Sequence, residues 1–285
     1  MIVAETETGY RFVTQPDHAD LAGQFAEGWG NDRFDEPGPY AACVLAAHDH
    51  DDGWSAFDRR PRLHDDGTPI DFREMAAEPW VDLYDEGIES VAEADPYAGL
   101  LVSMHGAGLR NRRYGLSPNW PETQPGFRAF VERQEARQEE LASELRAGGG
   151  SSRLSEADDD LLSTLHETGS TPEDADSRLW RNYELLQAWD TLSLSFCTSV
   201  SPPSYPEIGS VPTGGPGTEV TLTVEAIGDG EFRVDPYPFD AEPLEVAVPA
   251  RTIRKADFAD EASLFEAYYE AERQTMAFRI CRDGQ

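Results

Sequence analysis

The sequence predicts an α+β fold, in which a mainly helical bundle carries a smaller antiparallel β-sheet region towards the C-terminal end. Up to about residue 200, apolar residues recur at the three- and four-residue spacing of amphipathic helices. After Pro202, β-branched residues alternate with polar ones over short segments, which is typical of strands. We therefore expect a helical body over 1–200 and a β region over 201–285, packed together as one unit.

The helical body is expected to begin with a short strand at 9–14, where aromatic and β-branched residues alternate. Helices should follow, because proline or capping residues stand where several apolar periodic segments begin. They are expected at 16–29, 40–51, 81–94, 96–109, 127–146, 156–165 and 171–197. A glycine run at 148–150 separates two of these helices, and glycine-rich segments of this kind are flexible.

The β region contains several short alternating segments. Strands are expected at 218–227, 231–234, 244–253 and 276–281, and a helix at 261–273. Gly228, Asp229 and Gly230 lie between the first two strands, and this composition favours a hairpin loop. Consecutive strands joined by short loops pair antiparallel, which is why an antiparallel sheet is predicted.

The chain is strongly acidic, with 55 Asp and Glu residues against 23 Lys and Arg, and its formal charge is −32. Such a chain repels phosphate backbones and anionic lipids, so we expect neither a nucleic-acid nor a membrane partner. Lys255 is the only lysine, and acidic residues are spread along the whole sequence, which favours a surface adapted to molar salt. We expect a cytoplasmic protein of a halophile, since no secretory signal precedes the fold and the three cysteines form no CxxC pair.

Histidine and aspartate residues suggest a metal site. The segment at 48–54 reads HDHDDGW and places His50 and Asp51 at the end of an apolar helix. Imidazole and carboxylate groups are suitable ligands for Mn, Fe, Zn or Mg. His18 lies in the first predicted helix, and Asp190 lies among apolar residues of the helix at 171–197. We predict that these four side chains hold a divalent metal ion.

Ordinary structural explanations remain open for the same residues. In so acidic a chain, a histidine beside several aspartates at a helix end arises easily by chance, as a solvated group of charges. A buried Asp190 needs a cation, an arginine or a hydrogen-bond network, because an unpartnered buried carboxylate is costly. Alternatively, Asp190 lies on a narrow polar stripe of its helix.

The arrangement resembles that of the HD-domain phosphohydrolases, in which a helical bundle holds a metal ion through a histidine, a His-Asp doublet and a distant aspartate. On this resemblance, His18 is the first histidine, His50 and Asp51 are the doublet, and Asp190 is the distant aspartate. His105 stands where some members place an additional histidine.

Over nearly the whole chain, the sequence is also similar to an uncharacterised family, a domain of unknown function. The segments that carry this similarity are QPDHA, HDDGW, DPYAGLLVSMHG and WDTLSLSFC, at 15–19, 50–54, 95–106 and 189–197. This resemblance implies a shared fold and supplies no reaction.

Together these residues predict a metal-dependent hydrolase of a small molecule, with a phosphate ester as the expected substrate. A divalent ion would make hydroxide available near neutral pH. His105 would be a further ligand, the partner of a ligand or a general acid. Arg110, Arg112 and Arg113 follow it, and arginine suits bidentate phosphate binding, although these residues could instead neutralise carboxylates or a helix C-terminus. The alternative function is non-catalytic, with the same polar residues forming a buried structural network or binding a small ligand.

Overall fold

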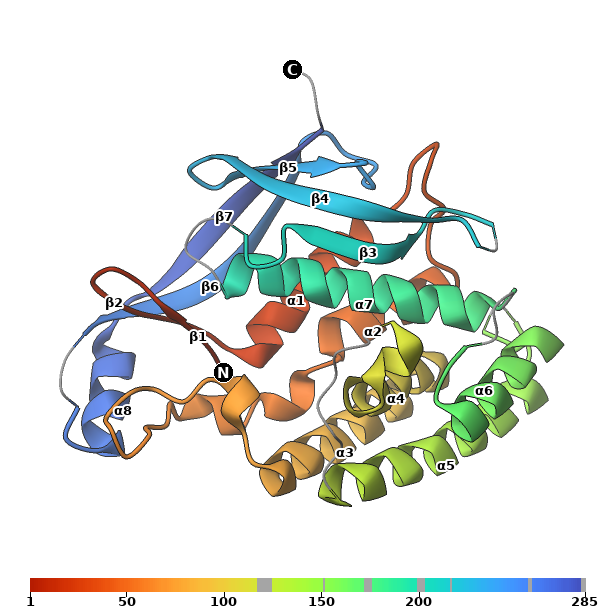
Figure 1. Ribbon diagram of the computed structural model, residues 1–285, viewed down its shortest axis with the longest axis horizontal. Helices are drawn as coiled ribbons and strands as arrows, with labels where there is room; N and C mark the ends of the chain where they lie inside the picture. Colours follow the sequence, from red (N-terminus) through yellow and green to blue (C-terminus); the bar gives the residue numbers. More distant parts are fainter. Residues whose placement is uncertain are drawn as a thin grey trace.

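A computed structural model describes residues 1–116, 125–150, 152–171, 176–198, 203–215, 217–255 and 258–282. These residues form a mixed α+β structure, which confirms the predicted fold class. Figure 1 shows a curled sheet above helices α1 and α7, with a further layer of helices below them.

The helices are α1 (Gln15–Glu27), α2 (Tyr40–Asp49), α3 (Ala77–Ala94), α4 (Pro96–Arg110), α5 (Pro125–Ala147), α6 (Glu156–Thr168), α7 (Arg178–Cys197) and α8 (Glu261–Glu270). Short 3₁₀ helices are η1 (Asp52–Trp54), η2 (Phe57–Arg59), η3 (Phe72–Glu74) and η4 (Arg112–Gly115). Capping side chains fix several helix starts. Thr14 accepts a hydrogen bond from the backbone N–H of Asp17 at α1, and Asp95 caps α4 in the same way.

Helix α4 runs through the middle of the helical layers. It packs against α2, α3, α5 and α7, and every residue from Tyr97 to Gly108 is buried. A Cβ atom at Gly99 would lie 2.4 Å from the Cβ of Ala92, so glycine at this position allows α3 and α4 to approach closely. Residues of α4 therefore lie in the protein interior, and His105 is among them.

The sheet consists of β1 (Ile2–Glu5), β2 (Gly9–Val13), β3 (Glu207–Pro212), β4 (Glu219–Gly228), β5 (Glu231–Asp235), β6 (Leu244–Arg254) and β7 (Arg273–Cys281). Their order is β1-β2-β6-β7-β5-β4-β3. Strands β5 and β7 are parallel, and the other neighbouring pairs are antiparallel.

Helices α1 and α7 cover one face of the sheet, α1 against β6 and α7 against β3 (Figure 1). Aromatic side chains fill the space between them and the strands. The ring centroid of Phe25 in α1 lies 5.8 Å from those of Phe196 in α7 and Phe239 in the β5–β6 connection. This shared apolar core holds α1 and α7 side by side, which brings residues from early and late in the chain together.

The sheet differs from the predicted one in three respects. Strand β1 was not predicted, because four residues are too few for alternation to be recognised. Strand β3 was not predicted, since a bulge between Ile208 and Val211 interrupts its alternation. The expectation of a C-terminal, antiparallel region was too narrow, because β1 and β2 join the sheet through β6 and β5 pairs parallel with β7.

Four helix boundaries differ from the prediction by three residues or more: α3 begins at Ala77 instead of 81, α6 ends at Thr168 instead of 165, and the start of α7 and the end of α8 also differ. Helix α7 begins at Arg178, because the side chain of Ser177 caps the backbone N–H of Trp180. Of the predicted start at 171–174, residues 172–174 lie outside the described residues. Helix α8 ends at Glu270, because Arg273 already pairs with Arg251 in the sheet. Among the described residues, we find no helix with the length and apolar character to cross a membrane.

Candidate metal centre

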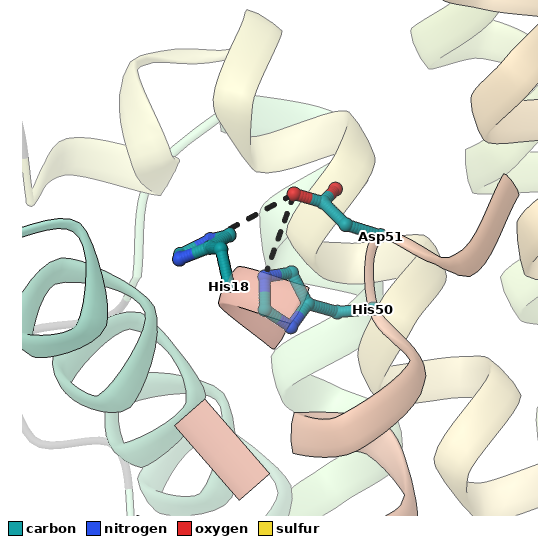
Figure 2. A group of neighbouring side chains, drawn as sticks. All are labelled: His18, His50 and Asp51. Carbon is teal, nitrogen blue, oxygen red and sulfur yellow. Dashed lines mark ion pairs between the residues drawn. The ribbon is translucent and has the colours of Figure 1, made fainter. Parts of the chain in front are cut away.

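The predicted ligands meet in the interior, beneath the sheet. His18 comes from α1, His50 and Asp51 follow the end of α2, and Asp190 comes from α7. Figure 2 shows the side chains of His18, His50 and Asp51 pointing toward one another. The side chains of all four residues are at most 5% exposed. Solvated helix-end charge therefore does not describe this cluster.

The end of α2 explains how the side chains of the consecutive residues His50 and Asp51 both point toward His18. His50 is still in the helical region, with φ −59° and ψ −24°, whereas Asp51 leaves it, with φ −118° and ψ 17°. Helix α1 is fixed just before His18 by the Thr14 cap. Asp190 lies on α7, where core packing with α1 and α4 encloses it.

Each of the two imidazoles lies close to both carboxylates. Nε2 of His18 lies 3.1 Å from Oδ1 of Asp190 and 3.8 Å from Oδ2 of Asp51. Nε2 of His50 lies 3.7 Å from each of the same two oxygens. Ligand atoms about 2.0–2.1 Å from a tetrahedral ion are separated by about 3.3–3.4 Å, so these spacings fit a metal ion at the centre. The ligand atoms of His18, His50 and Asp51 all lie within 4.8 Å of one another, so these three residues form a group that could hold a metal ion, and Asp190 adjoins this group.

Hydrogen bonds orient both ligand histidines. Ser193 Oγ donates to the carbonyl of Asp190 (2.9 Å), so it accepts from Nδ1 of His18 (2.7 Å). Nδ1 of His50 donates to the carbonyl of Ala47 (2.9 Å). In the neutral rings, Nε2 is therefore the free lone pair in both cases. Nε2 of His50 is buried and has no hydrogen-bond partner, as expected of an atom placed to bind a cation.

Asp51 is held by two neighbours that the sequence analysis missed. The hydroxyl of Tyr84 in α3 donates to Oδ1 (2.7 Å), and Nε2 of Gln15 in α1 donates to Oδ2 (3.1 Å). Burial raises the pKa of Tyr84 well above its ordinary value, so its hydroxyl remains a donor at neutral pH. Gln15 lies within the QPDHA segment, whereas Tyr84 carries no sequence signal that marks it as a site residue.

The cluster has strongly perturbed electrostatics. Burial opposes the charged form of His50, but the nearby charges of Asp51 and Asp190 outweigh it and raise the pKa of His50 to about 9. Burial likewise opposes the charged form of Asp190, yet the neighbouring imidazoles of His18 and His50 hold its pKa well below the ordinary range. Without a metal ion, a proton on His50 supplies the positive charge that the carboxylates require.

His105 lies beside this cluster. Its ring centroid is 5.0 Å from that of His50, and its Nδ1 accepts a hydrogen bond from Nε2 of Gln187 (2.7 Å). Burial lowers the pKa of His105 to about 3, so the imidazole is neutral at pH 7. The predicted roles of His105, as a further ligand, the partner of a ligand or a general acid, stay predictions.

The three arginines lie in different surroundings. Arg113 donates to Oδ2 of Asp190 (3.4 Å) and to Oγ1 of Thr191 (3.2 Å), and its side chain is 21% exposed. Arg110 points elsewhere, with its guanidinium 3.9 Å and 3.7 Å from the ring centroids of Trp80 and Phe127. Arg112 is exposed. The prediction that Arg110 binds a phosphoryl group stays a prediction.

The backbone from Arg112 to Tyr114 forms a left-handed turn. Arg112, Arg113 and Tyr114 have φ values of 52°, 48° and 53°, a left-handed conformation that non-glycine residues rarely adopt. Tyr114 anchors the turn, because its ring is buried against that of Tyr183 with centroids 5.7 Å apart. Strained turns of this kind occur at functional sites, where surrounding packing maintains them. Here the turn places Arg113 over Asp190.

His48 belongs to the same short motif but not to the cluster. It contacts Asp20 (3.0 Å) and Glu27 (3.3 Å) and is 24% exposed, so it is the solvated helix-end charge that the alternative explanation describes. The sequence places His48 and His50 two residues apart, and the helix turns them to different sides.

A family described as a protein of unknown function (DUF3891) matches residues 1–255. No curated protein and no solved structure matches the chain. The family match covers the four ligand candidates, His105 and the arginines. The resemblance to HD-domain enzymes stays a prediction.

Proposed function

Since the chain belongs to the DUF3891 family, whose function is unknown, we propose from its geometry that it is a metal-dependent hydrolase. The ligands of the divalent ion, whether Mn, Fe, Zn or Mg, are His18, His50, Asp51 and Asp190. The observation that carries the proposal is the buried group of His18, His50 and Asp51, whose ligand atoms lie within 4.8 Å of one another, with Asp190 Oδ1 3.1 Å and 3.7 Å from Nε2 of the two histidines. A divalent ion at this position would supply the positive charge that buried carboxylates require.

The residues around the ion perform defined tasks. A bound divalent ion supplies Lewis acidity, which lowers the pKa of water towards neutrality. Ser193 and the carbonyl of Ala47 keep His18 and His50 in the tautomer with Nε2 free. Tyr84 and Gln15 fix the carboxylate of Asp51 in place. Preorganisation of this kind reduces the rearrangement needed during reaction.

A small phosphate ester is the substrate class that we propose. Arg113 is the partly exposed group next to the buried ligands, and its guanidinium already contacts Oδ2 of Asp190. A planar guanidinium at this position suits the oxygens of a phosphoryl group. In a chain with a formal charge of −32, a basic group beside the cluster is needed to attract an anionic substrate.

One observation favours the non-catalytic alternative. The raised pKa of His50 and the lowered pKa of Asp190 support a network in which protonated histidine compensates the carboxylates without any metal ion. In that case the cluster is a buried ion-pair network that specifies the packing of α1, α2 and α7.

Metal analysis distinguishes the two functions. Protein purified without chelator or metal-affinity resin should contain about one divalent ion per chain, measured by inductively coupled plasma mass spectrometry, and should hydrolyse p-nitrophenyl phosphate. His50→Ala and Asp51→Ala should lose both the ion and the activity. His48→Ala is the matched control, because His48 lies in the same motif outside the cluster. Folded wild-type protein that takes up no Mn, Fe, Zn or Mg would refute the proposal.

A further inference from the structure

The three buried histidines do not use their ring nitrogens in the same way. His18 and His50 each donate from Nδ1, to Ser193 Oγ and to the carbonyl of Ala47. His105 is the opposite case, because its Nδ1 accepts from the side-chain amide of Gln187 (2.7 Å). A neutral imidazole carries one proton, so the proton of His105 lies on Nε2.

The orientation of the Gln187 amide supports this assignment. In the observed orientation, Nε2 of Gln187 donates to His105 and only Oε1 lacks a partner. If the amide of Gln187 were flipped, its NH₂ group would occupy the buried position where Oε1 now has no partner. That NH₂ group would then have no acceptor. Buried N–H groups without acceptors are rarer than under-used carbonyl oxygens. The side chain of Gln187 therefore sets the tautomer of His105.

We propose that Gln187 is a positioning residue that keeps His105 as a neutral N–H donor, and that this donor binds an oxygen of an anionic, phosphate-like ligand beside the cation position. The substrate class rests on the proposed function, whereas the tautomer does not. His105 then has a different role from His18 and His50. The Nε2 lone pairs of His18 and His50 bind a cation, whereas the Nε2–H group of His105 donates a hydrogen bond to an anion.

The position of His105 suits this task. The centroid of its ring lies 5.0 Å from that of His50, so it is a direct neighbour of one of the proposed ligands. Its burial excludes water, which strengthens a hydrogen bond to an anion. A neutral imidazole donates without changing its own charge, and together with Arg113 it provides two donors of different kinds near Asp190.

Nitrogen NMR on the metal-free protein tests the tautomer directly. In ¹⁵N-histidine-labelled protein, the signals that disappear in His105→Gln belong to His105. They should show a protonated Nε2 and an unprotonated Nδ1. Gln187→Glu should invert this pattern, because a carboxylate accepts a proton from Nδ1. Gln138→Glu is the matched control: it alters another buried glutamine that contacts a histidine, His166, and should leave the His105 signals unchanged. A protonated Nδ1 in the wild-type protein would overturn the proposal.

Phosphate binding tests the donor role. Calorimetry with inorganic phosphate and Mn²⁺-loaded protein should give a dissociation constant about 10- to 100-fold higher for His105→Leu than for the wild type, as expected for the loss of a hydrogen bond to a charged group. His105→Gln should stay within about 3-fold of the wild type, because the glutamine amide places an N–H near the position of the imidazole Nε2. Equal phosphate affinity in His105→Leu and the wild type would refute the donor role.

The two proposals fail in different ways. If the wild-type protein takes up no divalent ion, the proposed hydrolase fails, while the NMR experiment on metal-free protein still decides the tautomer. If Mn²⁺ binds in the wild type and in His105→Leu but phosphate affinity is unchanged, the metal centre stands and the role of His105 is wrong.

Discussion

Nε2 of His18 lies 3.1 Å from Oδ1 of Asp190, although His18 belongs to the first helix of the chain and Asp190 to α7. Both side chains are almost fully buried, so the contact ties α1 to α7 in the protein interior. The same two side chains are also proposed metal ligands. Their contribution to the stability of the metal-free protein and their contribution to metal binding can be measured in separate experiments.

Asp190→Asn should destabilise the metal-free protein. The substitution keeps the shape of the side chain but leaves a protonated His50 beside one carboxylate instead of two. Breaking a buried ion pair costs about 3–5 kcal/mol, and we expect the free energy of unfolding in urea at pH 7 to fall by about that amount. Asp52→Asn, at an exposed position of the same motif, should change it by less than about 0.5 kcal/mol. Equal effects of the two variants would show that Asp190 has no ion-pair role.

The metal-free protein should lose stability as the pH rises. The pKa of His50 is raised to about 9 in the folded state, against about 6.5 in the unfolded chain. The stabilisation is therefore fully present below pH 6.5 and is lost as the pH rises through about 9, an effect of about 3 kcal/mol. Burial lowers the pKa of His105 to about 3, so in the folded state it is neutral across this range, and its protonation in the unfolded chain affects stability only near pH 6.5.

Urea titrations with EDTA at pH 6.5, 7.5, 8.5 and 9.5 measure this decline. His50→Gln should remove most of it, which separates His50 from other titrating groups. With Mn²⁺ in excess the decline should disappear, because the ion requires neutral histidine and competes with protons. A decline that persists unchanged in His50→Gln would assign it to other residues.

Arg110 and Arg113 should give opposite phenotypes. Arg110 stacks on Trp80 and Phe127, so Arg110→Leu should lower the free energy of unfolding by about 1–2 kcal/mol and leave phosphate affinity unchanged. Arg113→Leu should weaken phosphate binding about 10-fold or more, because it removes a charged donor next to Asp190. Calorimetry with inorganic phosphate and urea unfolding measure the two effects. The reverse pattern would assign the phosphate to Arg110.

Stability should rise with salt concentration. A formal charge of −32 produces self-repulsion, and molar salt screens it because the Debye length falls to about 3 Å. The midpoint of thermal unfolding should increase between 0.1 M and 3 M KCl, and sucrose at equal osmolality should give a smaller increase. An unchanged midpoint would contradict adaptation to a salt-rich cytoplasm.

The sequence predicted the helices well because their apolar residues repeat over many turns. It also predicted the four ligand candidates, and each for a local reason: a doublet at a helix end, a histidine after a capped start, and an aspartate among apolar residues. Whether they meet depends on the packing of α1 and α7 against the sheet, and local pattern does not encode that packing. The distances between Nε2 of His18 and the carboxylates of Asp51 and Asp190 supply this information.

The supporting residues were harder to predict. Tyr84 and Gln187 are ordinary members of amphipathic or buried helices, and only their contacts with Asp51 and His105 distinguish them. The three arginines looked alike in sequence, yet a left-handed turn separates Arg113 from Arg110. The edge strands were missed because β1 is short and β3 is bulged.

The pairing of β2 with β6 has a consequence for synthesis on the ribosome. Gly9 to Phe12 emerge early, but their partners Arg251 to Arg254 emerge only after nearly the whole fold has been translated. Until then the β1–β2 hairpin has a free edge, which is open to pairing with other chains. Products truncated before β6 should therefore be prone to aggregation.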